Sequence, residues 1–236
     1  MSKEYGDLSL RRKIELSEQD QLFLIDRLKE KEYKKILEIG TFMGGVTNIL
    51  HHVLPESNIY SVDLSPSDIV GSTFSGDYSK VRFFNGKYSF EVIEEIGEDI
   101  DLVFIDTDHV LPGELLDYLM VYPFLKKNHS VIIHDIDLHR IKPDVEGYSI
   151  SPRLLFNTLF GIKLSQWNIG YVELEDVDMS DEILSCLTFP WNNLNVISKR
   201  KALAAFFEQY YSLYFSREFE AICDEQLSRQ IKNLSS

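Results

Sequence analysis

The stretch from Lys35 to Leu50, KILEIGTFMGGVTNIL, constrains the fold of this chain more than any other. Its first apolar residues form a short run that ends at Gly40, which is typical of a strand covered on both faces. Gly40, Gly44 and Gly45 then allow the backbone to bend sharply and to approach a ligand closely. A helix that begins at this point would offer free N–H groups and the positive end of its dipole. The stretch therefore predicts a strand, a glycine turn and a helix that together face a ligand.

The residues of this turn disfavour a dinucleotide as that ligand. A pyrophosphate-binding turn follows the pattern G-x-G-x-x-G, in which the middle glycine clears room for the phosphates. Phe42 stands at the middle position of this chain, and Glu38 lies inside the motif. An acidic residue suits a ligand with a cationic end better than one with phosphates. An NAD-dependent oxidoreductase is therefore the less favoured alternative.

Composition and charge exclude several classes of partner. The chain has 24 basic and 38 acidic residues, a net charge of −14, which opposes binding to nucleic acid or to an anionic membrane surface. No apolar stretch reaches the roughly 18 residues that span a bilayer, and the N-terminus lacks the apolar core of a signal peptide. Cys186 and Cys223 lie too far apart for a metal or redox motif. These features predict a cytoplasmic protein.

Strand and helix patterns alternate along the chain, which predicts a mostly parallel sheet with helices on both faces. A helix is expected to begin near Ser17 and to bury an apolar stripe. The seven expected strands are residues 36–39, 58–62, 81–84, 100–105, 130–133, 170–174 and 195–198. The expected helices after the first are residues 46–53, 90–96, 114–125, 153–160 and 199–234. We expect one domain over residues 1–198 and a C-terminal helical extension over residues 199–236. The aromatic cluster of this extension suits a helix that caps the domain, or alternatively a homodimer seam or a lid.

Several of the expected strands end in polar residues. In open parallel sheets ligands bind at the carboxyl ends of the strands, so such residues are expected to converge on one rim. Asp63 ends the second strand about twenty residues after the glycine turn, the offset at which an acid binds ribose hydroxyls. The fourth strand is followed by Asp106 and His109, and the fifth by His134 and Asp135. Acids are rarely buried without a partner, so packing alone does not explain these ends.

Two sets of residues resemble a known family. The pattern E-x-G-x-x-x-G from Glu38 to Gly44 resembles motif I of the class I S-adenosylmethionine-dependent methyltransferases. The segments VFIDTDH and VIIHDI resemble the FID-x-DH … HD pattern of a branch of small-molecule and sugar O-methyltransferases. They resemble, more distantly, the catechol-type enzymes, in which D-x-x-K and a later D-[ND] pair surround a magnesium ion. The resemblance covers residues 22–135 and implies a Rossmann-like three-layer sandwich.

The resemblance also implies a function. It implies transfer of a methyl group from S-adenosylmethionine to a hydroxyl of a small molecule or sugar, assisted by Mg²⁺ or another divalent metal. The residues that it implies for cofactor binding are Glu38, Gly40, Thr41, Gly44, Asp63, Gly86, Tyr88 and Asp106. The residues that it implies for the metal are Asp106, His134 and Asp135, where His134 replaces an acid of several relatives. The implied catalytic residues are Asp106, His134 and His109, which occupies the position of the lysine base in the catechol-type enzymes.

These roles agree with the chemistry of the side chains. Carboxylates suit Mg²⁺, Ca²⁺ or Mn²⁺, and a metal would lower the pKa of the acceptor hydroxyl and orient it. Histidine, with a reference pKa near 6.5, suits proton removal near neutrality. One alternative is a metal-independent methyltransferase with His109 or His134 as base. Another is a catalytically inactive cofactor-binding protein, although a pure binder needs fewer titratable groups on this rim.

Overall fold

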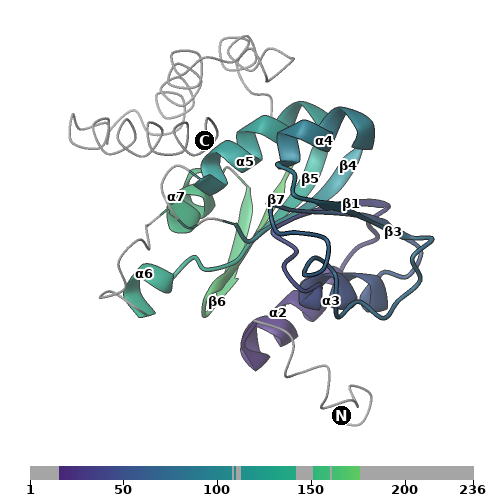
Figure 1. The fold of residues 1–236 in the computed structure, drawn as a ribbon. Helices are drawn as coiled ribbons and strands as arrows, with labels where there is room; N and C mark the ends of the chain where they lie inside the picture. The colour runs from purple at the N-terminus through teal and green to yellow at the C-terminus, as the bar shows by residue number, and fades with distance from the viewer. Residues whose placement is uncertain (1–15, 108, 110–112, 142–150, 160, 176–236) are drawn as a thin grey trace, which may run out of the picture.

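A computed structural model describes residues 16–107, 109, 113–141, 151–159 and 161–175. These residues form a seven-stranded sheet in the order β3-β2-β1-β4-β5-β7-β6 (Figure 1). The strands are β1 (Lys35–Ile39), β2 (Asn58–Asp63), β3 (Val81–Asn85), β4 (Ile100–Ile105), β5 (Leu125–Ile133), β6 (Ile162–Gln166) and β7 (Ile169–Leu174). The first five strands run parallel to one another, and β7 runs antiparallel to both β5 and β6. The prediction of a mostly parallel seven-stranded Rossmann-like sheet is confirmed.

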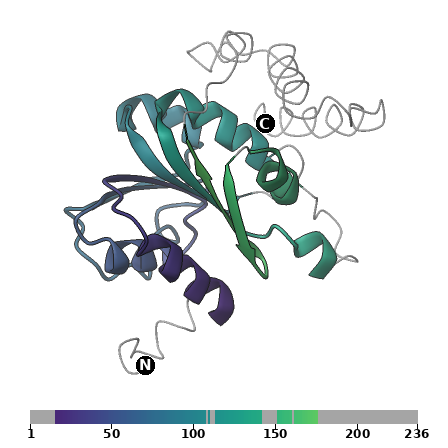
Figure 2. The ribbon, with the colours of Figure 1, turned by 180° about the vertical axis from the view of Figure 1, so that it is seen from behind.

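Helices cover both faces of this sheet (Figures 1 and 2). One layer contains α4 (Ser89–Ile96), α5 (Gly113–Val121) and α7 (Ser151–Thr158), and the other contains α2 (Glu18–Leu28) and α3 (Gly45–Val53). A short helix, α6 (Leu138–Ile141), follows β5 at the edge of the molecule. None of the helices in the described part of the chain is long and apolar enough to cross a bilayer.

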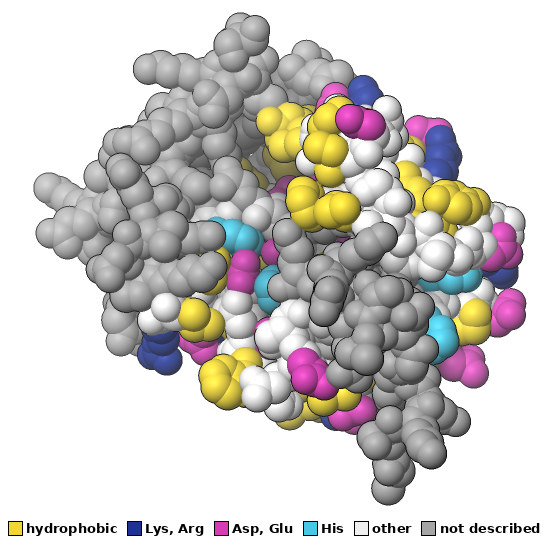
Figure 3. Space-filling view, turned by 60° about the horizontal axis from the view of Figure 1, so that its bottom comes forward, with side chains coloured by type: hydrophobic (Ala, Val, Ile, Leu, Met, Phe, Trp, Pro, Cys, Tyr) yellow, Lys and Arg dark blue, Asp and Glu magenta, His cyan; other side chains and the backbone are white. Residues whose placement is uncertain are grey.

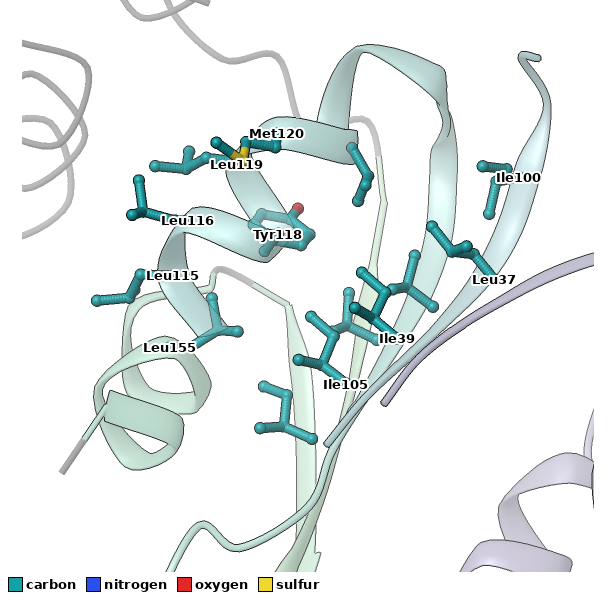
Figure 4. Close-up of a cluster of buried hydrophobic side chains, with 14 of the residues drawn as sticks. Leu37, Ile39, Ile100, Ile105, Leu115, Leu116, Tyr118, Leu119, Met120 and Leu155 are labelled. Atoms are coloured by element: carbon teal, nitrogen blue, oxygen red, sulfur yellow. The ribbon is translucent and has the colours of Figure 1, made fainter. Parts of the chain in front are cut away.

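Alternation along the strands gives the protein one apolar cluster on each face of the sheet. Leu37 belongs to the cluster under α4, α5 and α7, together with Leu115 and Tyr118 (Figure 4). Its neighbour Ile36 belongs to the opposite cluster, with Leu24 of α2. Successive side chains of a strand point to opposite faces, so a strand buried on both faces must be apolar at consecutive positions. This packing fixes the strand ends at which polar side chains gather.

Two expected elements differ from the structure. The helix expected over residues 114–125 ends at Val121, because the next residues form a 3₁₀ turn that contains Pro123, and β5 begins at Leu125. The seventh strand of the sheet is β6, which was not predicted because its side chains are mostly exposed and give no apolar pattern. The strand expected at residues 195–198, the extension over 199–236 and its dimer seam lie outside the described residues.

Candidate cofactor and cation site

The glycine turn after β1 needs glycine at two positions. Gly40 has φ of +92°, and a Cβ there would lie 1.7 Å from the backbone oxygen of Asp106. Gly44 has φ of +89° and is the N-cap of α3. Residues with a side chain rarely adopt these backbone angles, so both glycines are required by the turn itself. The turn thus brings the backbone after β1 against the backbone that follows β4.

Glu38 lies beneath this turn and is fully buried. One carboxylate oxygen, Oε2, accepts hydrogen bonds from the hydroxyls of Thr47, at 2.6 Å, and Ser61. The other, Oε1, is buried and has no hydrogen-bond partner among the described residues. Burial raises the pKa of Glu38 to about 7, although the two hydroxyls oppose the shift. Sequence reasoning missed Thr47 and Ser61, whose spacing gave no signal.

A pocket of about 190 Å³ opens above the turn. Its wall includes the predicted residues Gly40, Thr41, Asp63, Asp106 and His109, but neither Glu38 nor Gly44. The remaining lining residues are Phe42, Gly45, Val46 and Thr107. Thr41 connects the pocket to Glu38 indirectly, because its Oγ1 lies 2.6 Å from Oγ of Ser61. Glu38 therefore lies behind the pocket wall.

Asp63 is held at the pocket by two backbone groups. Its Oδ2 accepts a hydrogen bond from the N–H of Phe42 at 2.7 Å, and its Oδ1 accepts one from the N–H of Ser65 at 2.7 Å. A carboxylate has about four acceptor positions, so each oxygen of Asp63 keeps a further position for a ligand hydroxyl. Asp63 therefore presents unused acceptor positions at the pocket, and its binding of a ribose stays a prediction.

The loop after β3 lies beside Asp63 but not on the pocket wall. The N–H of Lys87 donates to the backbone oxygen of Asp63 at 3.1 Å. Gly86 has φ of +63° and faces open space. The ring of Tyr88 stacks on Phe90, with the ring centroids 5.1 Å apart. Neither predicted adenine neighbour, Gly86 nor Tyr88, is among the residues that line the pocket.

The ends of β4 and β5 bring three predicted metal ligands together. One ligand atom from each of Asp106, His134 and Asp135 lies within 4.8 Å of the others. Nδ1 of His134 is 3.2 Å from Oδ2 of Asp106 and 3.6 Å from Oδ1 of Asp135. Asp135 has φ of +57°, a backbone conformation that aspartate tolerates better than most residues. Histidine and acidic side chains lie next to one another on this face of the molecule (Figure 3).

Electrostatics at this cluster favour positive charge. Burial opposes protonation of His134, but the carboxylates of Asp106, Asp135 and Asp20 outweigh it and raise its pKa to about 9. Burial also disfavours the charged form of Asp135, yet contacts with His109 and His134 lower its pKa below the ordinary value. The cluster is thus a place where buried carboxylates require a cationic partner.

His109 lies between two carboxylates. Its Nε2 is 2.8 Å from Oδ2 of Asp135, and its Nδ1 is 3.1 Å from Oε1 of Glu114. Burial lowers the pKa of His109, but these two acids raise it to about 10. Glu114 is buried at the start of α5 and was missed by sequence reasoning, because its side chain looked like an ordinary first-turn acid.

Two comparisons of the sequence find similar proteins. Residues 37–136 match a family model described as a methyltransferase domain. Uncharacterized protein R132 of Acanthamoeba polyphaga mimivirus is 26% identical over 129 residues, which cover 49% of this chain and 58% of that relative. The match therefore spans less than two thirds of the relative's length.

Two solved structures share the fold. The O-methyltransferase TomG from Streptomyces achromogenes, in complex with SAM, has a TM-score of 0.53 at 13% identity, over 72% of this chain and 91% of that one. The O-methyltransferase from Bacillus cereus, in complex with SAH, has a TM-score of 0.53 at 16% identity, over 71% and 91%. The described part of the chain thus has the Rossmann-like fold of these O-methyltransferases, and residues 37–136 are similar in sequence to a methyltransferase domain.

Proposed function

We propose that this protein transfers a methyl group from S-adenosylmethionine to a hydroxyl of a small molecule or sugar, with the help of a divalent cation. The observation that carries the proposal is that Asp106 belongs to both the pocket and the acidic cluster. This residue lines the pocket over the glycine turn and also belongs to the cluster with His134 and Asp135. A cofactor in the pocket and a cation at the cluster would therefore be neighbours, as a cation-assisted transfer requires.

The pocket has the groups that this cofactor needs. Asp63 offers acceptors for the ribose hydroxyls, and the glycine turn lets the backbone approach the methionine end. Glu38 lies behind the wall, where its ionised form would supply negative charge for the cofactor's ammonium group. TomG and the Bacillus cereus enzyme, which share the fold, are described in complex with SAM and SAH.

The cluster at the ends of β4 and β5 fits a divalent cation. It combines two carboxylates and one imidazole within 4.8 Å. Both ring nitrogens of His134 are buried without a hydrogen bond to any described residue. The imidazole ligand shifts the preference from Mg²⁺ toward a transition ion, and among these Mn²⁺ also suits the two carboxylates. A cation held by Asp106, His134 and Asp135 would supply Lewis acidity that lowers the pKa of an acceptor hydroxyl.

His109 is our candidate for the group that removes the proton of the acceptor. It lies on the pocket wall beside Asp106, and Glu114 fixes the orientation of its ring through Nδ1. A cation bound to Asp135 would neutralise a carboxylate that raises the pKa of His109. The pKa of His109 would then fall toward neutral pH, where a general base works best. The net charge of −14 favours a small acceptor over a nucleic acid.

Calorimetric titration with S-adenosylhomocysteine, with and without Mn²⁺, tests this proposal. We expect micromolar binding of the nucleoside and separate heat from the cation. Absence of both heat and thermal shift with S-adenosylhomocysteine would refute the cofactor site. Formation of S-adenosylhomocysteine is then followed over a panel of catechols, phenols and sugars. Transfer that persists in a chelator would favour the metal-independent alternative, and cofactor binding without any transfer would favour an inactive binding protein.

A further inference from the structure

The cluster at the ends of β4 and β5 continues inward to a carboxylate on the N-terminal helix. Asp20 of α2 is buried, with 2% of its surface exposed. Its Oδ2 lies 4.0 Å from Nε2 of His134, while Nδ1 on the other side of the same ring faces Asp106 at 3.2 Å. The imidazole of His134 therefore lies between Asp20 and Asp106, another of the proposed cation ligands.

Asp20 is itself held in position from two directions. The hydroxyl of Ser17 donates to its Oδ2 at 2.6 Å, which fixes the carboxylate at the first turn of α2. The backbone N–H of Asn168 donates to its Oδ1 at 3.3 Å. Among the described residues, no lysine or arginine forms an ion pair with Asp20. In the described part of the chain, His134 is thus the side chain whose positive charge could pair with Asp20.

Asn168 connects Asp20 to a second proposed ligand. It lies in the turn between β6 and β7, where its side-chain amide donates to Oδ1 of Asp135. Its own Oδ1 accepts from the N–H of Asp137 at 2.8 Å, which fixes the amide so that its NH₂ faces Asp135. Asn168 therefore contacts both Asp20 and Asp135, the first through its backbone and the second through its side chain.

A histidine that binds a metal through one nitrogen commonly donates its other N–H to a carboxylate or carbonyl, which fixes the tautomer and the ring plane. We propose that Asp20 and Asn168 are positioning residues of the cation site. Asp20 keeps the proton of His134 on Nε2, so that the lone pair of Nδ1 faces the cation, and Asn168 aims Asp135 at the same point. This inference rests on the cation site of the proposed function.

Titration of the full chain with MnCl₂ tests the proposal. Asp20→Asn keeps the size of the side chain and removes its charge. Asn168→Ala removes the side-chain amide but keeps the backbone N–H that donates a hydrogen bond to Asp20. Both variants are expected to bind Mn²⁺ about 10 to 100 times more weakly, with unchanged affinity for S-adenosylhomocysteine. Asp26→Asn, an exposed position on the same helix, is the matched control and is expected to bind Mn²⁺ normally.

The tautomer of His134 gives a second readout, which would not depend on Asp20 if Asp20 only stabilised the fold. Two-bond ¹H–¹⁵N spectra of the unsubstituted protein saturated with Mg²⁺ are expected to show His134 protonated on Nε2 alone. Where Asp20→Asn fails to fold, this measurement and the Mn²⁺ affinity of Asn168→Ala still test the proposal. Protonation on Nδ1, or equal Mn²⁺ affinity in folded Asp20→Asn, would overturn the positioning role.

The failures of the two proposals are distinguishable. If the unsubstituted protein binds S-adenosylhomocysteine but gives no heat with MnCl₂, the cation site and its positioning residues are both wrong, and the cofactor assignment stands. If S-adenosylhomocysteine does not bind, the proposed function itself fails.

Discussion

Replacement of Glu38 by glutamine tests how the site is built, because it should stabilise the cofactor-free protein at high pH. Glu38 is fully buried, and its pKa is raised by burial from the ordinary 4.5 to about 7. At about 1.4 kcal/mol per tenfold change in proton affinity, this shift corresponds to about 3 kcal/mol. The buried carboxylate therefore costs about that much stability wherever it must be ionised.

The sign of the effect follows from proton binding. Below pH 4.5 the carboxyl is protonated in both folded and unfolded chains, so ionisation of Glu38 does not reduce the free energy of unfolding. Between pH 4.5 and 7 the unfolded chain loses the proton while the folded protein keeps it, so stability falls as pH rises. Above pH 7 both states are ionised and the loss is complete. Glutamine cannot titrate, so the variant should gain about 3 kcal/mol relative to the unsubstituted protein across this interval.

Urea unfolding at several pH values between 4.5 and 8, followed by circular dichroism, measures this difference. The quantity of interest is its change with pH, because groups other than Glu38 titrate equally in both proteins. Glu94→Gln, an exposed position on α4, is the control for the loss of a carboxylate that is not buried. A difference for Glu38→Gln that does not change with pH would refute the argument from burial. The same variant should bind S-adenosylhomocysteine more weakly at pH 8 if the carboxylate serves the cofactor's ammonium group.

Three further substitutions separate the roles of the site residues. Asp63→Ala should weaken S-adenosylhomocysteine binding by about 1–3 kcal/mol, through lost hydrogen bonds to the ribose, and unchanged affinity by calorimetry would refute this assignment. Asp135→Ala should abolish Mn²⁺ binding and leave S-adenosylhomocysteine affinity near normal, whereas equal Mn²⁺ uptake by both proteins would remove Asp135 from the cation site. His109→Ala should slow methyl transfer by about 10²–10⁴-fold at unchanged cofactor affinity, and an unaltered rate would leave His109 with a structural role.

The central strands could be predicted because their environment leaves a direct signal in the sequence. β1 and β4 are buried on both faces, so consecutive apolar residues mark them, and Gly40 and Asp106 mark where they end. β6 gave no such signal, because an edge strand with exposed side chains has no apolar face. The end of α5 was placed too late because the apolar residues around Pro123 continue the helical spacing beyond the point where proline ends it.

Some residues of the site could also be predicted from the sequence, and others could not. Asp106, His134 and Asp135 follow strand ends, and parallel strands bring their carboxyl ends to one edge, so strand order alone predicts that these residues meet. Asp20 and Asn168 are 148 positions apart and meet because α2 packs near the β6–β7 turn. In the sequence Asp20 is visible only as a first-turn acid that pairs with Ser17, which fully accounts for it locally. A residue that acts on a ligand through another side chain has no motif of its own, so only the tertiary structure places it.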